Sequence, residues 1–456
     1  MINLYNTYSK KVEEFRAING NKVGMYTCGP TVYDYDHIGH AWNYTAADLL
    51  RRMLEYSGFK VKQVINITDV GHLTSDADTG EDKLEKSARE TGKSAVELAK
   101  FFTKIYFDNR KKLNLEKPSV VAKATDHIKE MIRLVQILID KGFAYTISDG
   151  IYFDTSKFPD YGKLSGNTLE SLMEGARVEA NPEKKNPTDF ALWKFSPQNS
   201  KRQMEWNAFG KMGFPGWHIE CSAMSMKYLG QTLDLHTGGE DNIFPHHESE
   251  IAQSESATGK RFSNFWFHTR FLLVDGLKMS KSLKNFHTIK DLEDKGFSAL
   301  DLRYLFLQAH YATPINFTWE SLEGSKIARG KLNDFVLSIK GKGKVDKNYK
   351  EKFLEKINND LDLPGALGLV WLMIKDGKVS DLDKKATLFD FDKVLGLNLA
   401  KLKKEKIPGS VMKFVKEREI VRKNKDWAKS DELRNKIMEL GYLIEDTAQG
   451  SIVKKK

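Results

Sequence analysis

Four side chains with metal-binding chemistry are spread over three segments of the chain. Two are the thiols of Cys28 and Cys221, which are the two cysteines of the sequence. The others are His246 and Glu250, which are four residues apart and would share one face of a helix. Such a set can bind Zn²⁺, although the spacing is not that of a zinc finger and a free cysteine is usually just buried.

Two further segments carry groups suited to phosphate. In the first, His37-Ile38-Gly39-His40, two imidazoles stand three residues apart at the expected start of a helix, where backbone N–H groups attract phosphate. These histidines could instead cap the helix or pair with Asp34 and Asp36. The second segment, Lys278-Met279-Ser280-Lys281-Ser282, places two cations and two hydroxyls on an expected loop that could clamp pyrophosphate. Taken alone, such a cluster is usually a solvated surface turn.

The apolar pattern predicts the elements that position these groups. Residues Lys22–Thr27 are expected to form a buried strand, Ile38–Tyr56 an amphipathic helix, and Lys60–Thr68 a second strand. This βαβ unit implies a parallel sheet, whose ligands gather at the carboxyl ends of the strands. Cys28 and Thr68 fall at those ends.

The βα pattern is interrupted and then resumes. Between residues 118 and 216, helical periodicity at Ile128–Ile139 and an expected hairpin around Asp149-Gly150 indicate an insertion. The resumed pattern predicts helix Trp217–Tyr228, strand Gln231–Leu235, helix His246–Ser256 and strand Phe271–Val274. Long helices follow after about residue 325, and a short basic module ends the chain.

Composition favours a multidomain protein outside the membrane with a polyanionic partner. Hydrophobic residues make up 40% of the 456, and no stretch approaches the roughly 20 apolar residues that span a bilayer. Residues 401–456 hold 16 Lys and Arg against 9 Asp and Glu, so most of the net charge of +10 lies there. The N-terminus has no apolar signal core, so a cytoplasmic protein is expected.

The phosphate motifs together carry a family resemblance. HIGH at 37–40 followed about 240 residues later by KMSKS at 278–282 is the signature of class I aminoacyl-tRNA synthetases. The blocks Gly216–Met224, Leu235–Asp241 and Phe244–Ser254 resemble the cysteinyl-tRNA synthetases of that class. The resemblance runs nearly from end to end. The departures are Trp42 for a usual Arg, and Thr237 and Lys284 for usual glycines.

The resemblance implies an α/β fold, in which a Rossmann-like catalytic domain is split by an insertion and followed by a helical bundle and a small anticodon-binding domain. The expected segments are the first catalytic half at 1–114, the insertion at 115–210, the second catalytic half at 211–262, the KMSKS-bearing stem-contact region at 263–325, the bundle at 326–402 and the anticodon-binding domain at 403–456.

The resemblance also implies a reaction. L-Cysteine would be activated with Mg²⁺-ATP to cysteinyl-adenylate and transferred to the 3′-terminal adenosine of tRNA(Cys). One zinc ion per subunit, held by Cys28, Cys221, His246 and Glu250, would select the substrate thiolate, because a metal distinguishes sulfur from the oxygen of serine better than cavity size does. The family expectation is a monomer.

The implied roles extend to the other site residues. The ATP-binding positions are Thr31, His37, Gly39, His40, Lys278, Ser280 and Lys281, with His37, His40, Lys278 and Lys281 catalytic. The positions that contact cysteine are Gly29, Thr68, Trp217 and Asp241, with His218 and His236 as secondary candidates.

Three other functions compete with this interpretation. A cysteine ligase of the thiol-cofactor type shares the catalytic core, but its relatives lack the C-terminal module. A small-molecule nucleotidyltransferase with an HxGH site does not account for KMSKS. A non-catalytic tRNA-binding paralogue is opposed by the intact motifs and metal positions.

Overall fold

A computed structural model of the chain describes residues 1–71, 82–168, 181–197, 202–280, 283, 285–403, 407–447 and 450–455. The chain divides into two compact units, Met1–Ala400 and Lys401–Lys456. Within the described residues, no helix combines the length and apolar character needed to cross a membrane.

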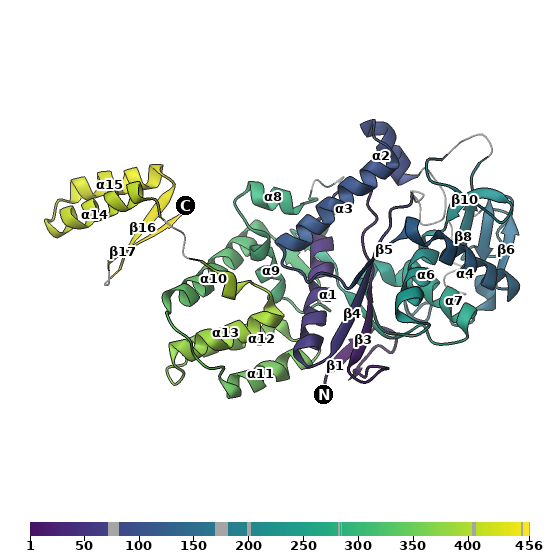
Figure 1. Cartoon of the computed structure of the whole chain (residues 1–456), viewed down its shortest axis with the longest axis horizontal. Helices are drawn as coiled ribbons and strands as arrows, with labels where there is room; N and C mark the ends of the chain where they lie inside the picture. The colour runs from purple at the N-terminus through teal and green to yellow at the C-terminus, as the bar shows by residue number, and fades with distance from the viewer. Residues whose placement is uncertain are drawn as a thin grey trace. The chain divides into compact units, whose positions relative to one another are not determined.

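A parallel sheet forms the centre of the first unit (Figure 1). Its described strands lie in the order β12 (Ser263–Thr269), β11 (Leu233–Gly239), β3 (Lys22–Thr27), β4 (Lys60–Ile67) and β5 (Val120–Lys123). Helix α1 (Ile38–Tyr56) connects β3 to β4, and α7 (Glu248–Thr258) connects β11 to β12. The winding direction reverses between β3 and β11, and ligands of doubly wound sheets bind at such a switch point.

The predicted βαβ unit is confirmed: β3 and α1 have the expected bounds, and β4 ends one residue earlier than predicted. The prediction for β11 was wrong at both ends. The strand begins at Leu233 and continues to Gly239, because Thr237, Gly238 and Gly239 stay paired with β12 although their small side chains resemble a turn. Helix α7 begins two residues later than predicted, after an irregular turn at Ile243–His247 in which Phe244 has an extended backbone.

An antiparallel sheet forms the core of the inserted region. Its described strands lie in the order β6 (Ala144–Ile147), β7 (Gly150–Phe153), β8 (Phe190–Phe195), β10 (Lys211–Pro215) and β9 (Trp206–Ala208). The hairpin predicted around Asp149-Gly150 is confirmed as β6–β7. Helix α4 (Ile128–Asp140) packs against α6 (Trp217–Leu229), which leads back into the parallel sheet.

Two strands pair with a different sheet from the one that the expected domain boundaries at residues 115 and 210 would give them. β5 belongs to the parallel sheet because it pairs with β4, and β10 belongs to the inserted sheet because it pairs with β8. The apolar pattern did not reveal these partners, since a short strand can pair with either sheet. The domains themselves stay a prediction.

The remaining elements of the first unit surround the sheet. They are β1 (Asn3–Asn6), β2 (Lys11–Glu14), α2 (Lys83–Thr91), α3 (Ala95–Lys112), β13 (Leu272–Val274), β14 (Leu277–Lys278), α8 (Ile289–Asp294), α9 (Ala299–Leu307), β15 (Ile315–Phe317), α10 (Trp319–Ser338), α11 (Lys347–Asn358), α12 (Leu363–Lys375) and α13 (Asp381–Leu395). A buried ion pair ties α1 to α9, with Arg303 Nη2 2.8 Å from Asp48 Oδ2. Arg303 also donates to the Leu395 carbonyl at 2.7 Å, so the helix that begins with HIGH is fixed to the bundle.

The second unit contains α14 (Gly409–Lys423), α15 (Trp427–Glu439) and the hairpin β16 (Tyr442–Thr447)–β17 (Gly450–Lys455). Its small core includes Val411, Val415, Ile437 and Ile444. The Arg418 guanidinium donates to both Asp446 carboxylate oxygens, at 2.7 and 3.0 Å, and lowers the pKa of Asp446 to about 2. This ion pair joins α14 to the hairpin.

Candidate active site and metal centre

A cavity of about 590 Å³ opens at the carboxyl ends of β3 and β11, the switch point of the sheet. The predicted site residues that line it are Cys28, Gly29, Thr31, His37, Gly39, His40, Trp217, Asp241 and Lys278. The other metal candidates, Cys221, His246 and Glu250, are buried beside Cys28. The structure therefore brings Cys28, the HIGH segment and the start of the KMSKS segment to one cavity.

The HIGH segment begins α1 in a compact, hydrogen-bonded geometry. His37 is the N-cap, and its Nδ1 accepts from the backbone N–H groups of Gly39 and His40 at 3.1 and 3.2 Å. The capping alternative considered for this motif is therefore real for His37. Because Nδ1 accepts hydrogen bonds, the proton of a neutral His37 ring is on Nε2. A Cβ on Gly39 would lie 2.7 Å from Met279 Cε and 2.9 Å from the His37 ring, so a larger residue would displace the Met279 side chain and crowd His37.

The two HIGH imidazoles are neutral at pH 7. Burial and the neighbouring His40 lower the pKa of His37 to about 3, and enclosure in the cavity lowers the pKa of His40 to about 4. Their rings stack with centroids 3.7 Å apart, which further disfavours two positive charges. They can therefore donate hydrogen bonds to phosphate oxygens but supply no charge.

The charge at this end of the cavity comes from the KMSKS segment. Lys278 lies on β14, with its Nζ 4.4 Å from the centroid of the Phe271 ring. The Ser280 N–H donates to Asn285 Oδ1 at 2.8 Å, and the Asn285 amide donates to the Lys278 carbonyl, which closes the turn. The predicted residue Lys281 lies outside the described residues, as does Lys284.

The predicted metal-binding residues lie together at the opposite end. We call Cys28, Cys221, His246 and Glu250 the Cys221 donor set. Their four donor atoms all lie within 4.8 Å of one another, and each residue is at least nine-tenths buried. They come from the end of β3, from α6, from the turn before α7 and from α7, with His246 Nε2 3.1 Å from Glu250 Oε1.

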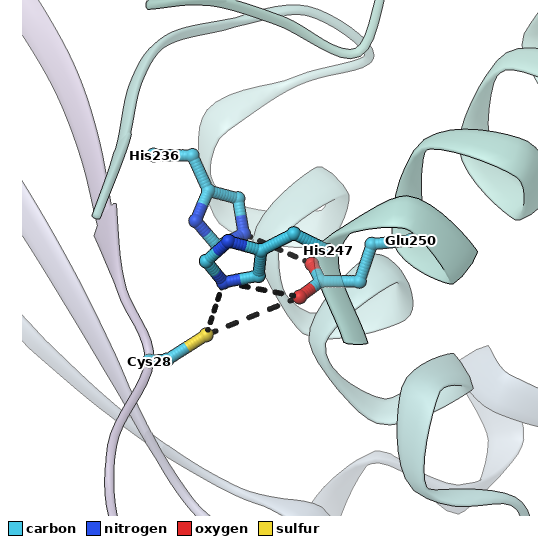
Figure 2. Close-up of side chains that lie close together, drawn as sticks. All are labelled: Cys28, His236, His247 and Glu250. Carbon is cyan, nitrogen blue, oxygen red and sulfur yellow. Dashed lines mark hydrogen bonds and ion pairs between the residues drawn. The ribbon is translucent and has the colours of Figure 1, made fainter. Parts of the chain in front are cut away.

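A second group shares two of these residues. Figure 2 shows this His247 donor set, which consists of Cys28, His236, His247 and Glu250. His247 Nε2 lies 3.2 Å from Cys28 Sγ, and His236 Nε2 lies 2.9 Å from Glu250 Oε2. His247 Nδ1 bonds to His268 Nε2 at 2.7 Å. Sequence reasoning missed His247, although its position three residues before Glu250 could have indicated a shared helix face.

The secondary candidates His218 and His236 both contact the Cys221 donor set. His218 Nδ1 lies 2.9 Å from His246 Nδ1, and His236 holds the second oxygen of Glu250. Such outer contacts orient metal-binding side chains in proteins. A Cβ on Gly238 would lie 2.6 Å from the His247 ring, so a glycine is required where β11 passes this cluster.

The electrostatics of the Cys221 donor set favour a cation. Burial disfavours the charged form of His246, but hydrogen bonds and charges from Cys221 and Glu250 outweigh it and raise the pKa of His246 to about 10. Burial raises the pKa of the Cys28 thiol, whereas hydrogen bonding from Cys28 lowers the pKa of Cys221. Two thiols, an imidazole and a carboxylate in a dry site fit Zn²⁺, for which these are the ordinary ligands.

Of the four predicted cysteine contacts, Gly29, Trp217 and Asp241 line the cavity, whereas Thr68 is buried and is not among its lining residues. The Trp217 ring is 4.5 Å from the His246 ring and forms a wall of the cavity. Gly29 donates its N–H to Asn66 Oδ1 at 2.6 Å, and a Cβ there would lie 1.8 Å from the Asn66 carbonyl oxygen. The buried Thr68 hydroxyl donates to Glu220 at 2.8 Å. Asp241 lines the cavity, and burial raises its pKa.

Two of the departures from the family pattern are accommodated by their surroundings. Trp42 is buried in α1, and its indole N–H donates to the Arg270 carbonyl at 2.9 Å. The Thr237 hydroxyl lies 3.0 Å from that of Thr27, so it bridges β11 and β3.

The chain matches the family model described as "tRNA synthetases class I (C) catalytic domain" over residues 14–327. It is 45% identical to cysteine–tRNA ligase 1 of Burkholderia lata, over 98% of this chain and 95% of that protein. It is 41% identical to the cysteine–tRNA ligase of Treponema denticola, over 100% of this chain and 99% of the relative.

The fold has counterparts among solved structures. The methionyl-tRNA synthetase of Mycobacterium tuberculosis in complex with methionyl-adenylate superposes with a TM-score of 0.56 at 15% identity, and the match covers 83% of this chain and 90% of that one. This likeness shows the fold alone, which is that of the class I synthetases. Taken with the family match and the identities over the full length, it shows that the chain belongs to the cysteine–tRNA ligase family of class I aminoacyl-tRNA synthetases.

Proposed function

We propose that the protein is a cysteine–tRNA ligase, which activates L-cysteine with ATP to cysteinyl-adenylate and then transfers cysteine to the 3′-terminal adenosine of tRNA(Cys). One observation carries the proposal. A single cavity is lined by Cys28, the member of the thiol, imidazole and carboxylate cluster that reaches it, and by residues of HIGH and KMSKS. A thiol-bearing amino acid and the phosphates of ATP would therefore meet within it.

The first end is proposed to hold one Zn²⁺ on Cys28, Cys221, His246 and Glu250. Ligands of a tetrahedral zinc are roughly 3.3–3.8 Å apart, so donor atoms within 4.8 Å need only small movements. When bound, zinc supplies a thiophilic Lewis acid, which distinguishes a thiol from the far less acidic hydroxyl of serine. His236 and His247 hold Glu250 and Cys28 from the outer side.

Substrate cysteine would be oriented by the residues between the two ends. Trp217 supplies an apolar wall next to the donor set, and the Asp241 carboxylate can pair with the substrate ammonium group. Gly29 and Thr68 lie where β3 and β4 end, close to this position. The substrate carboxylate then points toward the end of the cavity lined by HIGH and KMSKS, which we call the phosphate end.

Activation needs no nucleophile from the protein. The cysteine carboxylate attacks the α-phosphate of Mg²⁺-ATP, and pyrophosphate leaves. The neutral imidazoles of His37 and His40 donate hydrogen bonds near the phosphates, Gly39 and Thr31 leave room for the nucleotide, and Lys278, Ser280 and Lys281 bind the departing pyrophosphate. The 2′-hydroxyl of the terminal adenosine then attacks the adenylate, as the class I resemblance implies.

The second unit is proposed to bind the anticodon of tRNA(Cys). Residues 401–456 carry most of the net positive charge of the chain, and their two helices and hairpin form a separate compact unit. Contacts from Lys and Arg to the RNA backbone release counterions, so binding should weaken as salt rises. We infer a cytoplasmic monomer from the family resemblance, and sedimentation of the purified chain would test its oligomeric state.

The proposed function is tested by pyrophosphate exchange with each of the twenty amino acids, before and after treatment with a chelator. We expect exchange with cysteine, little with serine, and a loss on chelation that zinc restores. Aminoacylation of a tRNA(Cys) transcript tests the second step. Exchange with another amino acid, or transfer of cysteine to an amino sugar instead of tRNA, would contradict the proposal.

A further inference from the structure

Two exposed aromatic rings lie side by side next to the mouth of the cavity. Tyr35, in the loop before α1, is 47% exposed, and Phe101, on α3, is 40% exposed. Their ring centroids are 6.3 Å apart with an angle of 84° between the planes. The buried Phe102 ring supports Tyr35 from below, with the two centroids 5.3 Å apart. The two rings therefore form a supported aromatic surface that remains open to solvent.

Positive charge accompanies these rings. Lys93 Nζ lies 4.9 Å from the centroid of Phe101, and we call Tyr35, Phe101 and Lys93 the Tyr35–Phe101 platform. On the same surface of α3, Lys100 and Lys104 are also exposed. The acidic Glu97 is bonded back to the Ser94 N-cap, and Asp108 pairs with Lys104. Aromatic rings interleaved with cations are the typical surface for single-stranded nucleic acid, where rings stack on bases and cations meet phosphates.

The platform is continuous with the active site. Tyr35 itself lines the cavity, next to Asp36 and His37, whereas Phe101 lies outside it. If the last nucleotide of a single-stranded RNA enters the cavity, the nucleotides that precede it would therefore lie over Tyr35 and then over Phe101.

We propose that the Tyr35–Phe101 platform binds the single-stranded 3′ end of the tRNA, with the bases that precede the terminal adenosine stacked on Tyr35 and Phe101 and a backbone phosphate near Lys93. This proposal rests on the proposed function, since it names the surface that delivers the acceptor to the adenylate. Phe101 and Lys93 lie outside the lining of the cavity, so they act on tRNA binding and take no part in adenylate formation.

The test compares two reactions of the same variants. In Phe101→Ala, we expect the KM for a tRNA(Cys) transcript to rise about tenfold, which corresponds to the loss of one base–ring stack. Cysteine-dependent pyrophosphate exchange, measured without tRNA, should keep its rate and its KM for ATP. Phe101→Tyr keeps a ring and should behave as wild type, whereas Tyr35→Ala should impair aminoacylation as Phe101→Ala does. Lys93→Ala should give a smaller rise in KM that disappears at high salt.

A second arm tests stacking directly. Among transcripts that each carry one abasic nucleotide in the 3′ single strand, one should raise the KM of the wild type about tenfold and cost Phe101→Ala almost nothing more, because its base is the one that stacks on Phe101. If every abasic transcript raises the KM of Phe101→Ala by the same factor as that of the wild type, the platform does not bind the 3′ end. A rise in the KM for ATP of Phe101→Ala during exchange would also overturn the proposal. Absence of cysteine-dependent exchange in the wild type would instead overturn the proposed function, so the two failures are distinguishable.

Discussion

Histidine side chains at the two ends of the cavity have pKa values shifted in opposite directions. At the donor-set end, Cys221 and Glu250 outweigh the effect of burial and raise the pKa of His246 to about 10. At the phosphate end, burial lowers the pKa of His37 to about 3 and that of His40 to about 4. The difference lies in the neighbours. Hydrogen bonds and charges from Cys221 and Glu250 outweigh burial at His246, whereas at His37 the nearby Asp34 does not offset burial and the adjacent His40.

This contrast separates two ways of selecting a ligand. The buried end collects anionic donors and so attracts a cation, which can in turn recognise sulfur. The end lined by HIGH offers neutral hydrogen-bond donors, and positive charge is supplied there by Lys278 on β14. Variants at the two ends should therefore fail in different ways.

The largest effect is expected from removing a thiol of the Cys221 donor set. Cys221→Ala should lose nearly all bound zinc and reduce cysteine-dependent exchange by at least about a hundredfold, because loss of a direct ligand exceeds the loss of an outer contact. Metal content by mass spectrometry and exchange kinetics measure the two effects. Two further variants, His246→Ala and His247→Ala, decide between the donor sets. Zinc should be lost from His246→Ala, as from Cys221→Ala. If zinc is lost from His247→Ala and not from Cys221→Ala, the metal belongs to the His247 donor set.

At the phosphate end, Lys278→Ala should lower the kcat of exchange about a hundredfold, because one charge that meets the departing pyrophosphate is removed. We expect the same of Lys281→Ala. Zinc content should stay at the wild-type level in both variants, in contrast to Cys221→Ala. If either lysine variant also loses zinc, the two ends do not act separately.

An intermediate effect is expected from His236, which holds Glu250 from behind the donor set. His236→Phe keeps a buried ring but leaves Glu250 Oε2 without this hydrogen bond, and zinc affinity should fall about 10- to 100-fold. His236→Gln retains a hydrogen-bond donor for Glu250 and should therefore recover much of the lost zinc affinity. Titration with a competing chelator measures the affinity, and equal losses in both variants would show that only the ring's packing matters.

The smallest expected effect concerns pH: lowering it should not change how strongly a His37 substitution affects the exchange rate. The ratio of exchange rates between wild type and His37→Asn, which keeps an N-cap side chain, should not change between pH 8 and pH 6. The lowered pKa values mean that the folded protein binds protons at His37 and His40 only near pH 4 and below, so neither ring gains charge in this range. A ratio that changes with a midpoint near pH 6.5 would show that His37 titrates as an ordinary histidine.

Sequence patterns predicted the regular part of the site and missed its exceptions. β3 and α1 were predicted to the residue, because buried apolar runs end at a capped helix start. The end of β11 was missed, since Thr237-Gly238-Gly239 has the composition of a turn and stays in the sheet only through pairing with β12. His247 was missed because its closeness to Cys28 depends on packing between β3 and the turn before α7. The neutral state of His37 likewise depends on burial.

The order of strands in the parallel sheet governs when the metal centre can form during synthesis. β3 lies between β4, which follows it closely in the chain, and β11, which is made about 200 residues later. Until β11 and α7 have emerged from the ribosome, one edge of β3 is unpaired and the Cys221 donor set lacks Glu250. Such long-range pairing is slow to form. We therefore expect nascent chains that end before α7 not to retain zinc, so that metal uptake marks completion of the catalytic sheet.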